Sequence, residues 1–127
     1  MLQSVVAIGL GAALGAWLRF ALSAWLNGAT ALMPLGTLTA NLIGGYAVGV
    51  AVMVFTHHPE LPLAWRLFVI TGLLGGLTTF STFSAEVVHM LHQGRLWPAI
   101  ATIGAHLVGS LLMTVAGIAS VDAWRRL

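Results

Sequence analysis

The amino-acid sequence predicts an all-α integral membrane protein with four transmembrane helices. Two observations predict this fold: the chain carries few charged residues, and it contains four long apolar segments. A soluble domain of this length carries about a quarter charged residues, whereas only 6% of these residues are charged and 59% are hydrophobic. So few charges cannot cover a globular surface in water, and we infer that the solvent is lipid. The length of 127 residues suits a single domain, 1–127.

Composition also excludes several classes of protein. The absence of cysteine excludes disulfides and thiolate metal sites. Five arginines against three acidic residues are too few charges to form a nucleic-acid surface. No nucleophile–base–acid set and no metal-ligand cluster is apparent in the sequence, so we expect that the protein is not an enzyme.

Each of the four segments is long enough to cross a bilayer. A crossing takes roughly 20 predominantly apolar residues for a hydrocarbon layer of ~30 Å. Prolines and glycines, which favour turns and helix starts, separate the segments. Glycines four residues apart recur in the first three segments and indicate close helix packing. The expected helices cover about 5–26, 38–55, 63–91 and 97–121.

The first two helices differ in the polar side chains that they carry. The first contains one charged residue, Arg19. Arg19 either anchors the helix end by reaching toward the headgroups or forms a positive mouth that concentrates anions. The second helix has Thr37 and Asn41 near its start, and a side-chain amide in hydrocarbon needs hydrogen-bond partners.

The third segment is too long for one straight crossing and has a middle that disfavours a helix. At 1.5 Å per residue its length of about 29 residues would make roughly 43 Å of helix. Gly75 and Gly76 are followed by the β-branched Thr78 and Thr79, all poor helix formers. We therefore expect an interruption near residues 75–79, facing protein or a cavity. The alternative is a continuous, kinked helix whose hydroxyls bond back to carbonyls.

Aromatic and hydroxyl side chains follow the expected interruption. Phe80 and Phe83 lie one turn apart on one helix face, beside Ser81 and Ser84. The edge of a phenyl ring is positive, so ring edges and hydroxyl donors can replace water around a small anion without trapping it. The alternative for such a pair is ordinary packing. Glu86 is a functional candidate because ionisable groups are rare inside membranes.

The fourth helix carries one polar stripe. Thr102, His106, Ser110 and Thr114 follow one another at four-residue spacing and therefore share one slowly turning face. Such a stripe either holds helices together or lines a pathway. Because three segments carry polar side chains and little charge, we favour the pathway.

The arginines give little orientation bias. Four crossings place both termini on one side with Arg66, Arg125 and Arg126, and leave Arg19 and Arg95 toward the other side. A protein with fixed orientation usually shows a clear excess of positive residues inside. The chain therefore inserts one way with a weak bias, or inserts both ways and pairs as an antiparallel homodimer with its two-fold axis in the membrane plane.

These features together resemble the Fluc fluoride channels, also called CrcB proteins, over essentially the whole chain. The resemblance rests on residues 15–19, 36–45 and 72–86, the last containing Gly-Gly-Leu-Thr-Thr-Phe-Ser-Thr-Phe-Ser. It implies an antiparallel, dual-topology homodimer with two fluoride pathways, each lined by both subunits. It also implies passive fluoride export across the prokaryotic plasma (inner) membrane, which lowers fluoride toxicity.

The resemblance further implies roles for individual residues. Phe80 and Phe83 would present ring edges to fluoride, and Asn41 would donate from its amide. The other expected pathway residues are Thr37, Ser81, Ser84, His106, Ser110 and Thr114, with Arg19 and Glu86 near the entrances; His106 stands where relatives can have tyrosine. A structural sodium ion (Na⁺) would lie on the two-fold axis, bound by the backbone carbonyls of Gly75 and Thr78 from each subunit. Oxygen ligands suit such a hard cation.

Two other functions remain to be weighed. A small proton-coupled drug exporter is also short and four-helical, but it needs a membrane-embedded carboxylate, typically in the first helix. Here that helix has Arg19 and no acid, and Glu86 comes late in the chain. A non-transporting assembly subunit would carry no ion flux by itself.

Overall fold

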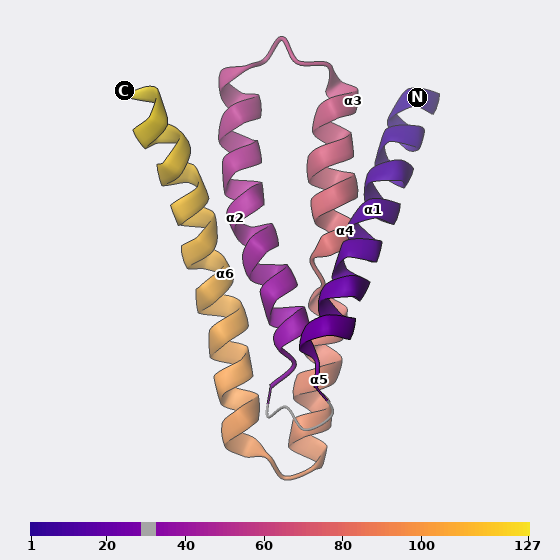
Figure 1. The fold of residues 1–127 in the computed structure, drawn as a ribbon, viewed down its shortest axis with the longest axis vertical. Helices are drawn as coiled ribbons and strands as arrows, with labels where there is room; N and C mark the ends of the chain where they lie inside the picture. The colour runs from indigo at the N-terminus through magenta and orange to yellow at the C-terminus, as the bar shows by residue number, and fades with distance from the viewer. Residues whose placement is uncertain (29–32) are drawn as a thin grey trace.

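The computed structural model describes residues 1–28 and 33–127, and it is helical apart from short connections (Figure 1). Among these residues, four segments are long and apolar enough to cross a membrane. They confirm the predicted all-α fold of a multi-pass membrane protein. The elements in chain order are α1 (Leu2–Leu26), α2 (Leu35–His57), α3 (Leu63–Arg66), the π-helical η1 (Leu67–Leu74), α4 (Gly75–Leu77), α5 (Phe80–His92) and α6 (Leu96–Arg125).

Four crossings are formed, in order, by α1, by α2, by the run from α3 to α5 (the third crossing) and by α6. They stand side by side and spread apart toward the end that carries both termini (Figure 1). The connection between α2 and α3 lies at this same end, and the connection between α5 and α6 lies at the other. Helix α1 packs against η1 and α4, whereas α2 packs along α6. Element α5 packs against α6 and also touches α2.

Glycines allow the paired helices to touch backbone to backbone. A Cβ atom at Gly76 would lie 2.5 Å from the Ala12 carbonyl oxygen of α1. A Cβ atom at Gly45 of α2 would lie 2.9 Å from the Ser110 carbonyl oxygen of α6. Since real Cβ contacts are longer than these distances, only glycine fits at both positions. The close packing predicted from the glycine spacing is confirmed at these two seams.

Few side chains are buried inside the single chain. Ala40, Leu74 and Leu77 form the centre of the main apolar cluster, between α2 and the third crossing. Large apolar side chains such as Phe20 and Leu111 are exposed on the helix surfaces. Because lipid tails are as apolar as these side chains, such exposure is expected in a membrane.

The third crossing changes its backbone geometry twice. It winds as a π-helix over Leu67–Leu74 and then continues as α4. Thr78 (φ −82°, ψ 154°) and Thr79 (φ −152°, ψ 119°) are extended, and α5 begins at Phe80. The Thr79 hydroxyl accepts a hydrogen bond from the backbone N–H of Thr82 at 3.1 Å, the usual geometry of a helix N-cap.

The helix ends extend beyond the apolar runs in the sequence. Helix α2 begins at Leu35 rather than 38, directly after Pro34. Helix α6 continues to Arg125 rather than 121. The expected ends followed hydropathy, whereas the helical hydrogen bonding continues beyond the apolar runs.

Candidate functional site

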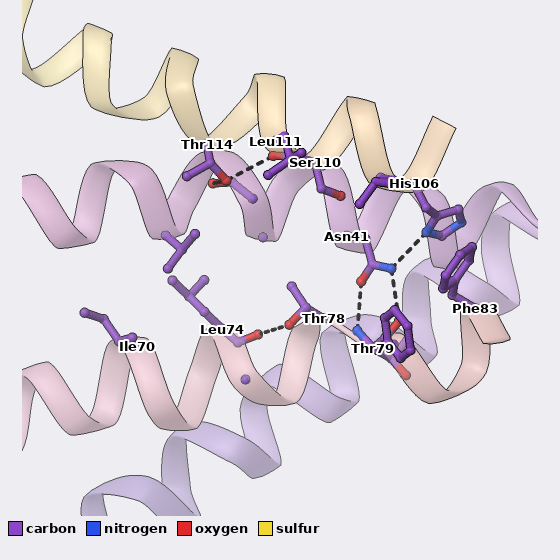
Figure 2. A pocket seen from close by; sticks show the side chains of 16 residues that line it. Asn41, Ile70, Leu74, Thr78, Thr79, Phe83, His106, Ser110, Leu111 and Thr114 are labelled. Atoms are coloured by element: carbon purple, nitrogen blue, oxygen red, sulfur yellow. Dashed lines mark hydrogen bonds between the residues drawn. The ribbon is translucent and has the colours of Figure 1, made fainter. Parts of the chain in front are cut away.

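A cavity of about 440 Å³ lies between α2, α6 and the third crossing, beside the extended residues (Figure 2). Its wall contains six of the predicted pathway residues and both predicted sodium ligands: Asn41, Phe80, Phe83, His106, Ser110, Thr114, Gly75 and Thr78. Polar groups from three crossings therefore converge on one space. Apolar side chains such as Ile70, Leu74 and Leu111 form much of the remaining wall.

Asn41 makes three hydrogen-bond contacts at the cavity (Figure 2). Its Oδ1 atom accepts from the backbone N–H of Thr79 at 2.8 Å, and its Nδ2 atom donates to the Thr79 carbonyl at 3.0 Å. The same Nδ2 atom lies 3.0 Å from Nδ1 of His106. The sequence analysis expected hydrogen-bond partners for this amide. They are the extended backbone of Thr79 and the imidazole of His106 on α6.

These contacts fix the tautomer of His106. The Thr79 N–H needs an acceptor and the Thr79 carbonyl needs a donor, so the orientation of the Asn41 amide is set. An amide nitrogen only donates, so Nδ1 of His106 accepts and the ring proton is on Nε2. His106 is only 4% exposed, and Nε2 has no hydrogen-bond partner within residues 1–28 and 33–127. His106 therefore carries a buried Nε2–H donor that has no partner among the described residues.

The aromatic rings of α5 lie next to this imidazole. Phe83 stacks on His106 with ring centroids 4.6 Å apart and an interplanar angle of 28°. Phe80 packs edge-on against Phe83 at 5.5 Å. Phe80 is 80% exposed, so one side of the cavity is open in the single chain.

Some hydroxyls of the polar stripe on α6 make hydrogen bonds within the chain, and one does not. Thr114 donates to the carbonyls of Gly45 at 3.0 Å and Ser110 at 2.9 Å. Thr102 is fully buried outside the cavity, and its hydroxyl donates to Pro98. The Ser110 hydroxyl makes no hydrogen bond with the described part of the chain, so it can donate to a ligand.

The remaining predicted site residues lie outside the cavity wall. The Thr37 hydroxyl donates to Oε1 of Glu86 at 2.5 Å, and Oε2 of Glu86 is buried without a partner among the described residues. Ser81 lies beside Thr79, with their hydroxyl oxygens 3.2 Å apart. Ser84 is half-buried on α5. The structure thus places Thr37, Ser81, Ser84 and Glu86 behind or beside the cavity.

Arg19 contacts the end of α4. Its Nε atom donates to the Gly76 carbonyl at 3.1 Å. The sequence offered a headgroup anchor or a positive mouth for this residue and did not identify the carbonyl partner. Its signal was indirect: Gly11 and Gly15 precede Arg19 at four-residue spacing, on the helix face that packs against the third crossing.

Comparison with known proteins supports one family. The family model for the CrcB-like protein, Camphor Resistance (CrcB), matches residues 6–118. A protein of Chromobacterium violaceum named fluoride-specific ion channel FluC is 58% identical over 126 residues, which cover 99% of this chain and 100% of that protein. Proteins of the same name are 56% identical in Pseudomonas putida, over 94% of both chains, and 54% identical in Tolumonas auensis, over 99% of both chains. These matches confirm the resemblance inferred from the three sequence segments.

Proposed function

We propose, because this chain belongs to the CrcB-like family, that it forms a fluoride-selective ion channel. The observation that carries the proposal is the cavity where an amide, an imidazole and phenyl rings from three crossings meet without a full charge. The relatives that match over nearly the whole chain are named as ion channels. The chain is accordingly not an enzyme, as the sequence predicted.

Fluoride is small and strongly hydrated, so a selective pathway must replace its water with other donors and still release it. Two donors that have no partner among the described residues are the Ser110 hydroxyl in the cavity wall and the buried Nε2–H of His106. Both N–H groups of Asn41 already have acceptors, so Asn41 donates to fluoride by releasing His106 or Thr79. The positive edges of the phenyl rings complete a lining that is attractive but uncharged.

A second, antiparallel copy of the chain would complete the site. Phe80 and Gly75 line the cavity, yet both are exposed in the single chain. A homodimer with a two-fold axis in the membrane plane would cover them and produce two equivalent pathways. The weak arginine bias supports insertion in both orientations. In this arrangement each pathway would use side chains from both subunits.

The residues at the interruption fit a structural sodium ion at the dimer centre. A helix end leaves its last carbonyls without intrahelical partners, and α4 ends directly before the extended Thr78 and Thr79. The carbonyls of Gly75 and Thr78 from two subunits would supply four oxygen ligands of the kind that a hard cation prefers. Bound there, the ion would hold the two interrupted helices together.

The proposed flow is passive, from the prokaryotic cytoplasm across the inner membrane, and lowers the fluoride content of the cell. The rival function, a proton-coupled exporter, needs a carboxylate that exchanges protons with substrate. Glu86 lies outside the cavity wall and pairs with Thr37, which does not favour that mechanism.

Ion efflux from liposomes that contain only the purified protein tests the function. A fluoride electrode and a chloride electrode are read in parallel, and protein-free liposomes are the control. We expect rapid fluoride loss with retention of chloride. Absence of fluoride flux from folded, dimeric protein would refute the channel, and proton-driven flux of an organic cation would favour the exporter.

A further inference from the structure

We propose that the Asn41 amide and the Thr79 hydroxyl are positioning groups for the cation site. Each accepts a hydrogen bond from a backbone N–H that would otherwise donate to a ligand carbonyl. Asn41 in this way keeps the Gly75 carbonyl free, and the Thr79 hydroxyl keeps the Thr78 carbonyl free. This inference rests on the proposed sodium ion and adds what keeps its ligands available. The two groups lie in the described part of the chain, and their contacts are within one protomer.

The argument begins with the hydrogen-bond pattern of a helix. In an uninterrupted α-helix each N–H donates to the carbonyl four residues earlier. The Thr79 N–H would therefore occupy the Gly75 carbonyl, and the Thr82 N–H would occupy the Thr78 carbonyl. Instead the Thr79 N–H donates to Oδ1 of Asn41 at 2.8 Å, and the Thr82 N–H donates to the Thr79 hydroxyl at 3.1 Å.

Neighbouring carbonyls at the interruption do have partners. The Leu74 carbonyl accepts from the N–H of Thr78 at 3.0 Å and from its hydroxyl at 2.8 Å. The Gly76 carbonyl accepts from Nε of Arg19 at 3.1 Å. The carbonyls of Gly75 and Thr78 accept from no group in residues 1–28 and 33–127. Groups around the interruption thus donate to the carbonyls of Leu74 and Gly76, whereas the carbonyls of Gly75 and Thr78 have no donor among the described residues.

Asn41 consequently belongs to both sites. It lines the cavity beside His106, and it holds Thr79 in the extended conformation through both of its amide atoms. Without Asn41, the Thr79 N–H can return to the Gly75 carbonyl, and a cation must then displace it. One net hydrogen bond in each of two protomers, about 2 kcal/mol together, corresponds to an affinity about 30-fold weaker.

Thermal unfolding of the purified dimer in detergent measures this effect. Sodium chloride is titrated against potassium chloride at constant ionic strength without fluoride, because an ion that binds only the folded state raises its stability with concentration. In Asn41→Leu and Thr79→Val we expect the sodium concentration that gives half of the stabilisation to rise about 30-fold. Thr79→Ser keeps the accepting hydroxyl, and Thr102→Val removes a buried hydroxyl far from the interruption. Both should retain the wild-type sodium dependence, although Thr102→Val lowers the unfolding temperature in every salt.

The outcomes separate the two levels of the proposal. If the wild-type protein does not distinguish sodium from potassium, the sodium ion and its positioning groups are both refuted, while fluoride efflux still tests the channel. If wild-type stability depends on sodium and both Asn41→Leu and Thr79→Val keep that dependence, only the positioning role is refuted. If Asn41→Leu does not form dimers, comparison of Thr79→Val with Thr79→Ser decides, because these variants differ at the accepting oxygen.

Discussion

Replacing Gly76 by alanine tests whether the seam between α1 and the third crossing positions the extended residues Thr78 and Thr79. The new methyl group would lie 2.5 Å from the Ala12 carbonyl oxygen and 3.1 Å from the Ala16 nitrogen. Both contacts are with backbone, so no side chain can rotate away. Helix α1 must move instead, and it carries Arg19, the donor to the Gly76 carbonyl.

The size of the effect follows from these distances. Ordinary contact begins at 3.4 Å, so the helices must separate by about 0.9 Å, the difference between 3.4 and 2.5 Å. Overpacking of this kind costs about 1–3 kcal/mol. Loss of the charge-assisted hydrogen bond from Arg19 costs about 1.5–3 kcal/mol more. The better helix propensity of alanine returns at most about 1 kcal/mol, so we expect a net loss of about 2–5 kcal/mol.

Thermal unfolding in detergent and fluoride efflux from liposomes measure the result. Gly9→Ala on α1, the helix that Gly76 packs against, is the control, because no atom lies within 4 Å of its new methyl group. We expect Gly76→Ala to unfold at a lower temperature and to lose most fluoride flux, and Gly9→Ala to behave as wild type. Equal stability and flux in the two variants would refute the close approach of α1 to α4.

Three further predictions concern the cavity, the buried carboxylate and the topology. Phe83→Ile should abolish most fluoride flux while the dimer persists, because the ring edge is lost and the bulk is largely kept; wild-type flux would remove the aromatic role. Thr37→Val should lower the free energy of unfolding by about 1–3 kcal/mol, since it removes the donor to Glu86. Adding Glu86→Gln to Thr37→Val should recover part of this lost stability in unfolding measurements. Equal stability of Thr37→Val and wild type would argue against the hydrogen bond. Single cysteines at Leu61 and Gln93, in a chain that has none, should each be labelled from both sides of the membrane if the topology is dual, and one-sided labelling would reject it.

The sequence was sufficient to predict four helices that are long and apolar enough to cross a membrane, because length and apolar content can be read from it directly. The interruption was expected near residues 75–79 from the low helix propensity of the glycines and threonines there, and the structure has extended dihedrals at Thr78 and Thr79 within that range. Six of the predicted pathway residues, proposed from spacing and resemblance, lie in the wall of one cavity. Their roles in fluoride passage stay predictions.

The pairing of polar groups could not be predicted from the sequence. Asn41 and Thr79 are 38 residues apart, and Thr37 and Glu86 are 49 apart. Helical periodicity tells which residues share a face, but it does not tell how one helix is rotated against the next. The π-helical winding of Leu67–Leu74 was likewise not expected, and no feature of its sequence explains it.

The contact of Arg19 adds a role that the sequence did not offer, a hydrogen bond to the Gly76 carbonyl, and this role can be tested against the positive mouth that the sequence did offer. A positive mouth would act through its charge over a distance, and salt screens such an effect with a Debye length of about 10 Å at 0.1 M. A hydrogen bond to the Gly76 carbonyl acts at contact and is screened much less. The geometry, with Nε 3.1 Å from that oxygen, favours the hydrogen bond. We therefore expect Arg19→Gln to reduce fluoride flux by a similar factor at low and high concentrations of an impermeant salt, and Gly9→Ala to leave flux unchanged at both. The opposite result is an Arg19→Gln flux that is reduced at low salt but equals the wild-type flux at high salt, because the wild-type flux has fallen. This result would instead identify Arg19 as a group that concentrates anions.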